Sequence, residues 1–124
     1  MKYEELYNDF KKLFPEDSDY FAEQENKLGR NSLDLLTVVF DSIVSPYLIK
    51  LADENPQKAK KAFDFVEGML SYDTDYIASV AEVSVLEMVM TDEDGGMKKL
   101  GKFLGPKSRS AVEQMAPYFN IQMD

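Results

Sequence analysis

The sequence predicts an all-α fold, a single domain over residues 1–124 arranged as a compact bundle or a short stack of helical hairpins with six or seven helices. Three observations support this class. Apolar residues recur at spacings of three and four along most of the chain. The six glycines and five prolines are sparse and fall mainly at segment boundaries. No pair of segments shows the alternating pattern of strands. A chain of 124 residues can bury one hydrophobic core.

Two helices are expected in the N-terminal quarter of the chain. The first covers residues 2–14 and ends before a proline, because the residue preceding a proline avoids helical backbone. The second covers residues 20–28, with Ser18 or Asp19 as its N-cap and Gly29 at its end.

A long apolar stripe predicts a third helix over residues 32–53, with Ser32 as its N-cap. Pro46 lies inside this helix, where a proline removes one backbone hydrogen bond and crowds the preceding turn. Two interpretations stay open. We favour a single helix kinked at Pro46, because the stripe keeps its phase, over two helices with Ser45 capping the second. The stripe consists of Leu33, Leu36, Phe40, Ile43, Tyr47 and Leu51.

Asn55 followed by a proline is typical of a helix start and predicts a fourth helix over residues 56–72. A fifth helix is expected to begin with Asp73 or Thr74 as its cap and to run to residue 90. Its apolar residues lie on most sides, which is typical of a helix at the centre of a fold.

The C-terminal quarter begins with an acidic, glycine-containing loop over residues 92–96. A short helix is expected over residues 97–104. Gly105 and Pro106 interrupt it, and a last helix follows over residues 107–119.

The chain contains no histidine, no cysteine and no tryptophan. Without cysteine there is no disulfide, thiolate nucleophile or iron–sulfur ligand, and without histidine there is no Ser-His-Asp triad and no His-containing di-iron site. We therefore expect neither catalytic residues nor a cofactor, and we do not expect an enzyme.

Asp92, Glu93 and Asp94 resemble part of a calcium-binding loop. An EF-hand loop in this register would need an oxygen ligand at residue 90 and a bidentate glutamate at residue 101. Those positions hold methionine and glycine, so the sequence predicts no metal site here.

Glu67 and Glu87 each stand among apolar neighbours. Such a setting can raise a carboxyl pKa and prepare it for acid–base chemistry. A structural pairing or capping role is the stronger interpretation, since a glutamate at the edge of a helix can reach water or pair with a lysine or arginine. A role at an interface is the alternative.

Charge is the most informative feature of the sequence. Of a formal net charge of −9, residues 73–95 contribute −7, with seven acidic and no basic side chains. This balance argues against binding to nucleic acid, and such a segment steers a basic partner and speeds association. A contribution to solubility alone is the alternative. The partner-binding residues that we predict are Asp73, Asp75, Asp92, Glu93 and Asp94.

The N-terminal residues are polar, and the most apolar stretch, residues 35–49, is interrupted by Asp41 and shorter than a membrane span. We therefore expect no secretory signal, no membrane association and a cytoplasmic location.

Residues 62–70 read AFDFVEGML, and residues 79–87 read SVAEVSVLE. Together they resemble a two-helix pattern of small all-helical bacterial proteins, many of them uncharacterised, some of which look like immunity proteins of polymorphic toxin systems. Residues 83–87 match the end of the second helix of that pattern. Ser79 stands where asparagine is common, and Glu82 where a small residue is common.

The resemblance implies a protein that binds a cognate toxin in the cytoplasm of the producing cell. We expect a non-catalytic, acidic protein-binding domain that neutralises such a toxin by occluding its basic site. The alternative is an interaction or scaffold module, or a subunit of a homo-oligomer, unrelated to toxins. The sequence leaves the oligomeric state open.

Overall fold

The computed structural model describes residues 1–72 and 76–120, which form helices and turns and contain no strand. The helical elements of these residues join into eight continuous helices, seven of which have at least seven residues. The predicted all-α class is therefore confirmed, with one helix more than expected.

The elements follow one another along the chain, with α for α-helix and η for a 3₁₀ or π segment. They are η1 (Tyr3–Glu5), α1 (Leu6–Lys12), η2 (Pro15–Asp17), α2 (Ser18–Leu28), α3 (Arg30–Leu33), α4 (Leu36–Val39), η3 (Phe40–Val44), α5 (Ser45–Glu54), α6 (Pro56–Leu70), α7 (Ile77–Ser79), η4 (Val80–Glu87), α8 (Met88–Met90), α9 (Gly96–Leu100), η5 (Gly101–Phe103), α10 (Pro106–Met115) and η6 (Ala116–Phe119).

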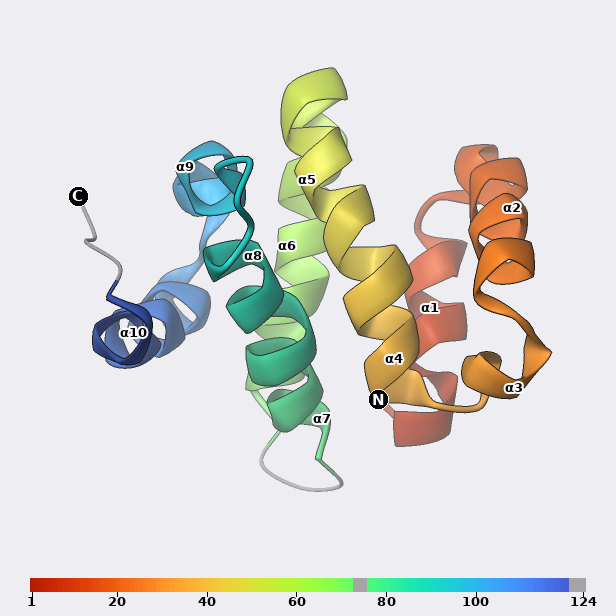
Figure 1. Ribbon diagram of the computed structural model, residues 1–124, viewed down its shortest axis with the longest axis horizontal. Helices are drawn as coiled ribbons and strands as arrows, with labels where there is room; N and C mark the ends of the chain where they lie inside the picture. Colours follow the sequence, from red (N-terminus) through yellow and green to blue (C-terminus); the bar gives the residue numbers. More distant parts are fainter. Residues whose placement is uncertain (73–75, 121–124) are drawn as a thin grey trace.

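Helices α5 and α6 stand side by side at the centre of the molecule, with α1–α3 on one side and α7–α10 on the other (Figure 1). The chain reverses between them at Asn55. The side chain of Asn55 accepts a hydrogen bond from the backbone N–H of Lys58 at 3.2 Å. The predicted N-cap of the fourth helix is therefore confirmed.

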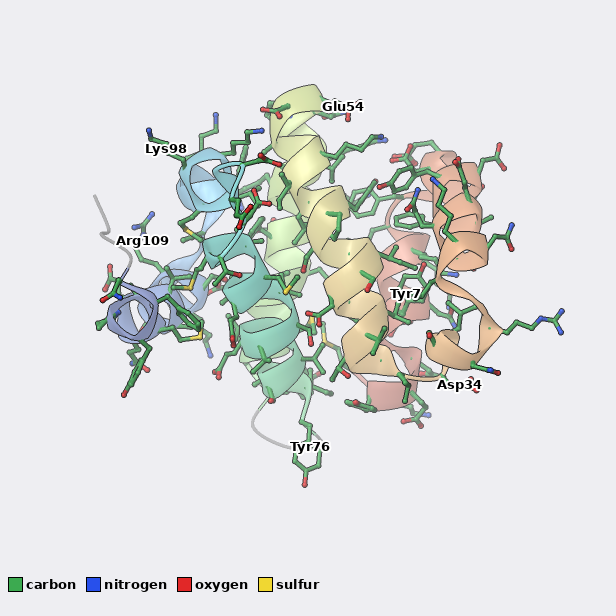
Figure 2. The ribbon with its side chains drawn as sticks, in the orientation of Figure 1. Tyr7, Asp34, Glu54, Tyr76, Lys98 and Arg109 are labelled. Carbon is green, nitrogen blue, oxygen red and sulfur yellow. The ribbon has the colours of Figure 1, made fainter. Side chains whose placement is uncertain are left out.

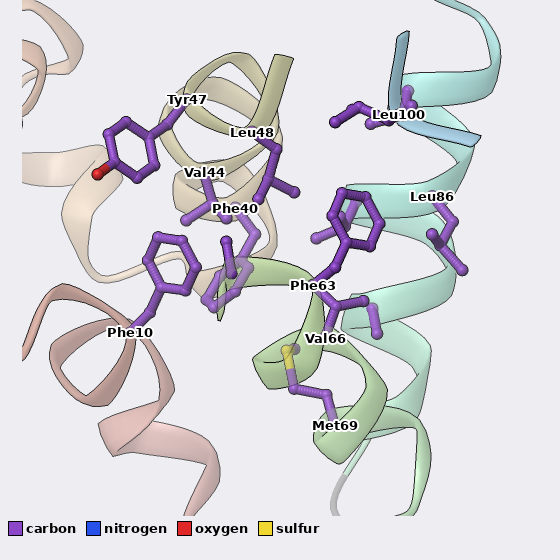
Figure 3. Close-up of a cluster of buried hydrophobic side chains, with 14 of the residues drawn as sticks. Phe10, Phe40, Val44, Tyr47, Leu48, Phe63, Val66, Met69, Leu86 and Leu100 are labelled. Carbon is purple, nitrogen blue, oxygen red and sulfur yellow. The ribbon is translucent and has the colours of Figure 1, made fainter. Parts of the chain in front are cut away.

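One cluster of buried apolar side chains joins the two sides of the fold (Figure 3). Phe10 of α1, Phe63 of α6, Leu86 of η4 and Leu100 of α9 are each at most 1% exposed. On the α1 side the rings of Phe10 and Tyr47 meet edge to face, with centroids 6.0 Å apart. Such pairs add about 0.5–1.5 kcal/mol beyond their buried area.

The expected start of the third helix is wrong. Ser32 belongs to the separate four-residue helix α3, and the long helix begins at Leu36. Between them Leu35 has extended backbone, with φ −100° and ψ 95°, and its side chain is 55% exposed. Extended backbone at one residue interrupts the helical hydrogen bonds, although the apolar spacing continues across it.

The long helix is continuous through Pro46, as α4, η3 and α5 follow one another without a break. The turns before Pro46 are π-helical, and the N–H of Ser45 bonds to the carbonyl oxygen of Phe40, five residues earlier. A wider turn gives the proline ring more room than an α-turn. Ser45 is not an N-cap; its hydroxyl donates to the carbonyl oxygen of Ser84 at 2.7 Å.

Neither Ser18 nor Asp19 caps α2. The N-cap position is Asp17, whose side chain makes no capping bond. Its carboxylate instead accepts hydrogen bonds from the Tyr47 hydroxyl and the Lys58 ammonium, contacts that local sequence cannot show. The Tyr47 bond is the main cause of a lowered Asp17 pKa.

The expectation that the fifth helix is central is wrong for one of its faces. Val83 is 52% exposed and Met88 is 40% exposed. Most of this helix is π-helical, so the phase of a 3.6-residue repeat does not hold. The helix begins after Tyr76, which has a left-handed φ of 63° and points away from the molecule (Figure 2). Asp73 and Thr74, the expected caps, lie outside the described residues.

A candidate protein-binding groove

The predicted partner-binding residues differ in their surroundings. Glu93 and Asp94 are exposed, as expected for charges that meet a partner. Asp92 is only partly exposed, and its carboxylate accepts a hydrogen bond from the N–H of Gly96 at 2.8 Å. Asp73 and Asp75 lie outside the described residues. Asp92 therefore holds the start of α9, while its two neighbours face solvent.

The acidic loop lies close to the C-terminal end of α5. Lys99 of α9 forms an ion pair with Asp53 of α5 at 2.9 Å. This bond raises the pKa of Lys99, and the charges of Asp92 and Asp94 raise it further. One lysine therefore offsets part of the loop's negative charge and connects the loop to the central helix.

A groove of about 220 Å³ lies where the long central helix meets α8 and the acidic loop. Figure 1 shows two continuous helices, α4–α5 and α7–α8, running side by side at this place. Apolar atoms make up most of its lining, with a carboxylate from η3 and another from the loop. The groove is lined by Asp41, Ser45, Pro46, Ile49, Met88 and Asp92.

The carboxylate of Asp41 is the functional candidate that sequence reasoning missed. Burial raises its pKa, and the negative charge of Glu87 raises it further. Among the residues that the structure describes, neither Asp41 nor Glu87 takes part in an ion pair. The partly buried Asp41 carboxylate is thus held without an ion-pair partner in the described structure, and carboxylates whose pKa is raised by burial are frequent at functional sites.

The two π-helical segments adjoin the groove, since η3 carries Asp41 and η4 ends just before Met88. Segments η3 and η4 pack against each other and carry Asp41 and Glu87. The buried bond from Ser45 to the Ser84 carbonyl holds them at a fixed separation. π-Helical turns occur often at functional sites, because they alter the direction in which side chains leave the helix.

A sequence signal for the groove did exist. Asp41, Ser45 and Ile49 are spaced by four, so they share one face of a helix. In the sequence Asp41 stands out only as a charge inside an apolar stretch. The contribution of Met88 and Asp92 has no local signal, because it depends on the packing of α8 beside α5.

Glu67 has the structural role that its sequence setting favours. Its carboxylate accepts hydrogen bonds from the N–H groups of Lys107 and Ser108, at 2.6 and 3.0 Å, and from the Ser108 hydroxyl at 2.7 Å. Burial acts to raise the pKa of Glu67, but these donors outweigh it and the pKa lies below its ordinary value. Glu67 therefore caps the first turn of α10.

For Glu87 no such partner is found among the described residues. Its backbone carbonyl accepts a bond from the Thr91 hydroxyl at 2.9 Å, but its carboxylate makes no hydrogen bond or ion pair within that part of the chain. The expected pairing or capping role thus holds for Glu67 alone.

Over residues 7–120 the chain matches the family described as a domain of unknown function, DUF7674. This chain belongs to that family. The comparison with curated proteins found no match, and the comparison with solved structures found none either. The family description carries no link to immunity proteins.

Two further properties concern the described residues only. Within residues 1–72 and 76–120, no three acidic side chains gather closely enough to hold a metal ion. Over the same part of the chain, no helix combines the length and apolar character needed to cross a bilayer.

Proposed function

We propose that this DUF7674 protein is a non-catalytic, protein-binding domain that receives a basic partner on the face formed by α4–α5 and α7–α8. The observation that carries the proposal is the groove itself. Its lining combines apolar carbon with the carboxylates of Asp41 and Asp92. In the described structure Asp41 takes part in no ion pair. A protein interface commonly has such an apolar centre with polar groups at its rim.

The exposed charges near the groove support the same function. Glu93 and Asp94 extend the negative surface beyond Asp92, and a surface of one sign attracts an oppositely charged partner over a distance of about a Debye length. Exposed Met88 offers the partner an apolar contact on the same face. Charge would set the rate of encounter, and the groove would set the lifetime of the complex.

The finer form of the proposal is an immunity protein acting in the cytoplasm of the producing bacterium. It rests on the resemblance of residues 62–70 and 79–87 to proteins of that kind. The face around the groove would cover the basic active site or substrate groove of a toxin, so inhibition would follow from occlusion. A toxin that acts on nucleic acid has a basic surface of the required sign.

The test of the proposal is binding to the product of the adjacent gene, purified separately and measured by surface plasmon resonance. A neutralised variant combines Asp41→Asn, Glu93→Gln and Asp94→Asn. Asp92 is kept, because it holds the start of α9. We expect the neutralised variant to lose roughly tenfold or more in affinity, with a slower association rate that depends less on salt.

The matched control neutralises three exposed glutamates elsewhere, Glu4→Gln, Glu5→Gln and Glu113→Gln, and so has the same net charge. It should retain most of the affinity. Equal losses in the two variants would contradict the groove as the binding surface. Absence of any complex with the neighbouring gene product would contradict the immunity form of the proposal.

The alternative, a subunit of a homo-oligomer, is favoured by the exposure of Val83 and Met88 on the same helix. Light scattering decides between the two functions. A dimer that persists in the wild type and dissociates on Val83→Lys would identify the exposed face as a contact between copies.

A further inference from the structure

We propose that the groove receives one arginine side chain of the partner protein. This inference rests on the proposed function and specifies the chemistry that the groove recognises. Three features of the groove support it: the size of the groove, its apolar lining and the placement of its carboxylates.

The groove has the dimensions of a single long side chain. About 220 Å³ is too little for a helix or a strand of a partner, which would need an open surface. Pro46 and Ile49 of α5 and Met88 of α8 provide apolar contact along its length. Long basic side chains bury an apolar stem while their charged end remains at a polar group, and this lining suits such a stem.

The carboxylates favour a guanidinium over an ammonium group. Asp41 of η3 and Asp92 of the acidic loop both line the groove, so together they accept from a flat group that donates in several directions. Arginine has five N–H donors in a rigid planar arrangement and is less strongly hydrated than lysine, which suits a partly buried site. Charge-assisted bonds of this kind are about twice as strong as neutral ones.

Two polar groups of the groove are already occupied in part. Asp92 accepts the N–H of Gly96, and the Ser45 hydroxyl donates its proton to the Ser84 carbonyl. The Ser45 oxygen and the second lone pairs of Asp92 still accept. The whole lining therefore offers acceptors and apolar carbon, which matches a group that only donates.

The Asp41 carboxylate supplies a reason for binding. It lines the groove, is partly buried and takes part in no ion pair of the described residues, so an incoming cation gives it a charge partner.

The experiment uses the full chain labelled with ¹⁵N and three capped pentapeptides, Gly-Gly-X-Gly-Gly, in which X is arginine, lysine or citrulline. Citrulline has the shape of arginine without its charge. In titrations followed by NMR, the arginine peptide should change the amide chemical shifts of Tyr47, Met88 and Val89. The citrulline peptide should cause no shift, and the lysine peptide should bind at least several-fold more weakly.

Two variants locate the site. Asp41→Asn should weaken binding of the arginine peptide by roughly tenfold. Met88→Ala should weaken it less, through loss of contact with the stem, and its partly exposed position makes it mild for the fold. Glu113→Gln on α10 is the control and should bind as the wild type does. Thermal melts monitored by circular dichroism confirm that each variant is folded.

Several results would overturn the inference: shifts by citrulline as large as those by arginine, equal affinity for lysine, shifts that map away from the groove, or unchanged binding by Asp41→Asn. If the arginine peptide fails while the neutralised triple variant loses the partner protein, the inference falls and the proposed function stands. If the partner is indifferent to that triple variant, the proposed function itself falls.

Discussion

Glu67 shows how one carboxylate places a helix that begins about forty residues later. It lies on α6, and its three bonds satisfy the N–H groups of Lys107 and Ser108 and the hydroxyl of Ser108. A helix N-terminus carries partial positive charge and unpaired N–H groups, so an ionised glutamate suits it better than a neutral side chain. The same contacts keep the pKa of Glu67 low.

We predict that Glu67→Gln lowers the free energy of unfolding at pH 7 by about 1–2 kcal/mol, because an amide accepts these bonds less strongly. The wild-type contribution is fully present above the ordinary pKa of about 4.5 and is lost as the pH falls through the lower folded-state pKa. Urea unfolding between pH 7 and pH 3 should therefore show a smaller pH dependence for the variant.

Glu113→Gln serves as the control, since Glu113 lies exposed on α10 itself. It should change stability by less than about 0.5 kcal/mol. Equal pH dependence in the wild type and in Glu67→Gln would show that the cap carries no charge-dependent stability.

At the scale of elements, α10 docks on α6 through a close approach at Gly105. A Cβ atom at this position would stand 2.7 Å from the Cδ and Oε2 atoms of Glu67. The backbone of Gly105 is extended, so the requirement for glycine comes from space and not from a left-handed φ. The cap and the glycine that makes room for it thus form one unit.

We predict that Gly105→Ala destabilises the protein by about 1–3 kcal/mol, because the added methyl group displaces the carboxylate from the first turn of α10. Gly101→Ala is the matched control. It adds the same methyl group where no atom lies within 4 Å, and its helical φ of −53° suits alanine. It should be neutral or slightly stabilising.

Thermal and urea unfolding measure both glycine variants. If the steric explanation holds, Gly105→Ala should lower the free energy of unfolding by less when Glu67 is already alanine. Strictly additive effects in the double variant would contradict the close contact as the cause.

For the whole molecule, one buried cluster extends from α1 to α10 and makes the two sides of the fold interdependent. Phe63 of α6 lies near its middle, beside Val66 and Leu86 (Figure 3). A shared core of this kind is expected to unfold in one cooperative step.

We predict that Phe63→Ala lowers the free energy of unfolding by about 3–5 kcal/mol, because it removes a fully buried ring and leaves a cavity. Hydrogen exchange should report the same loss of protection in α1 and in α10, on opposite sides of the residue. Loss on one side only would show that the two sides unfold separately.

Local signals predicted most of the helices and some of their caps, but not their place in the packing. Asn55 caps α6 as predicted, because an N-cap bond spans three residues. By contrast, Asp17 bonds to Tyr47 and Lys58, and Ser45 bonds to Ser84. These partners are distant in the sequence, so local sequence cannot predict the bonds. The exposure of Val83 was missed because a π-helical segment does not keep the α-helical phase.

The candidate site was predicted in part. Glu93 and Asp94 are exposed as the charge pattern suggested, whereas Asp92 also caps a helix. Asp41 and Met88, which both line the groove, lie 47 positions apart in the sequence and meet only because the two long helices pack together.

The sequence by itself determined the helical class, most helix boundaries and the concentration of negative charge, because these follow from residue spacing and composition. The tertiary structure decided which acids stand together, which of them already have partners, and where apolar carbon lies beside them. Such properties depend on contacts between distant segments, since a side chain acquires its surroundings only when helices pack against one another.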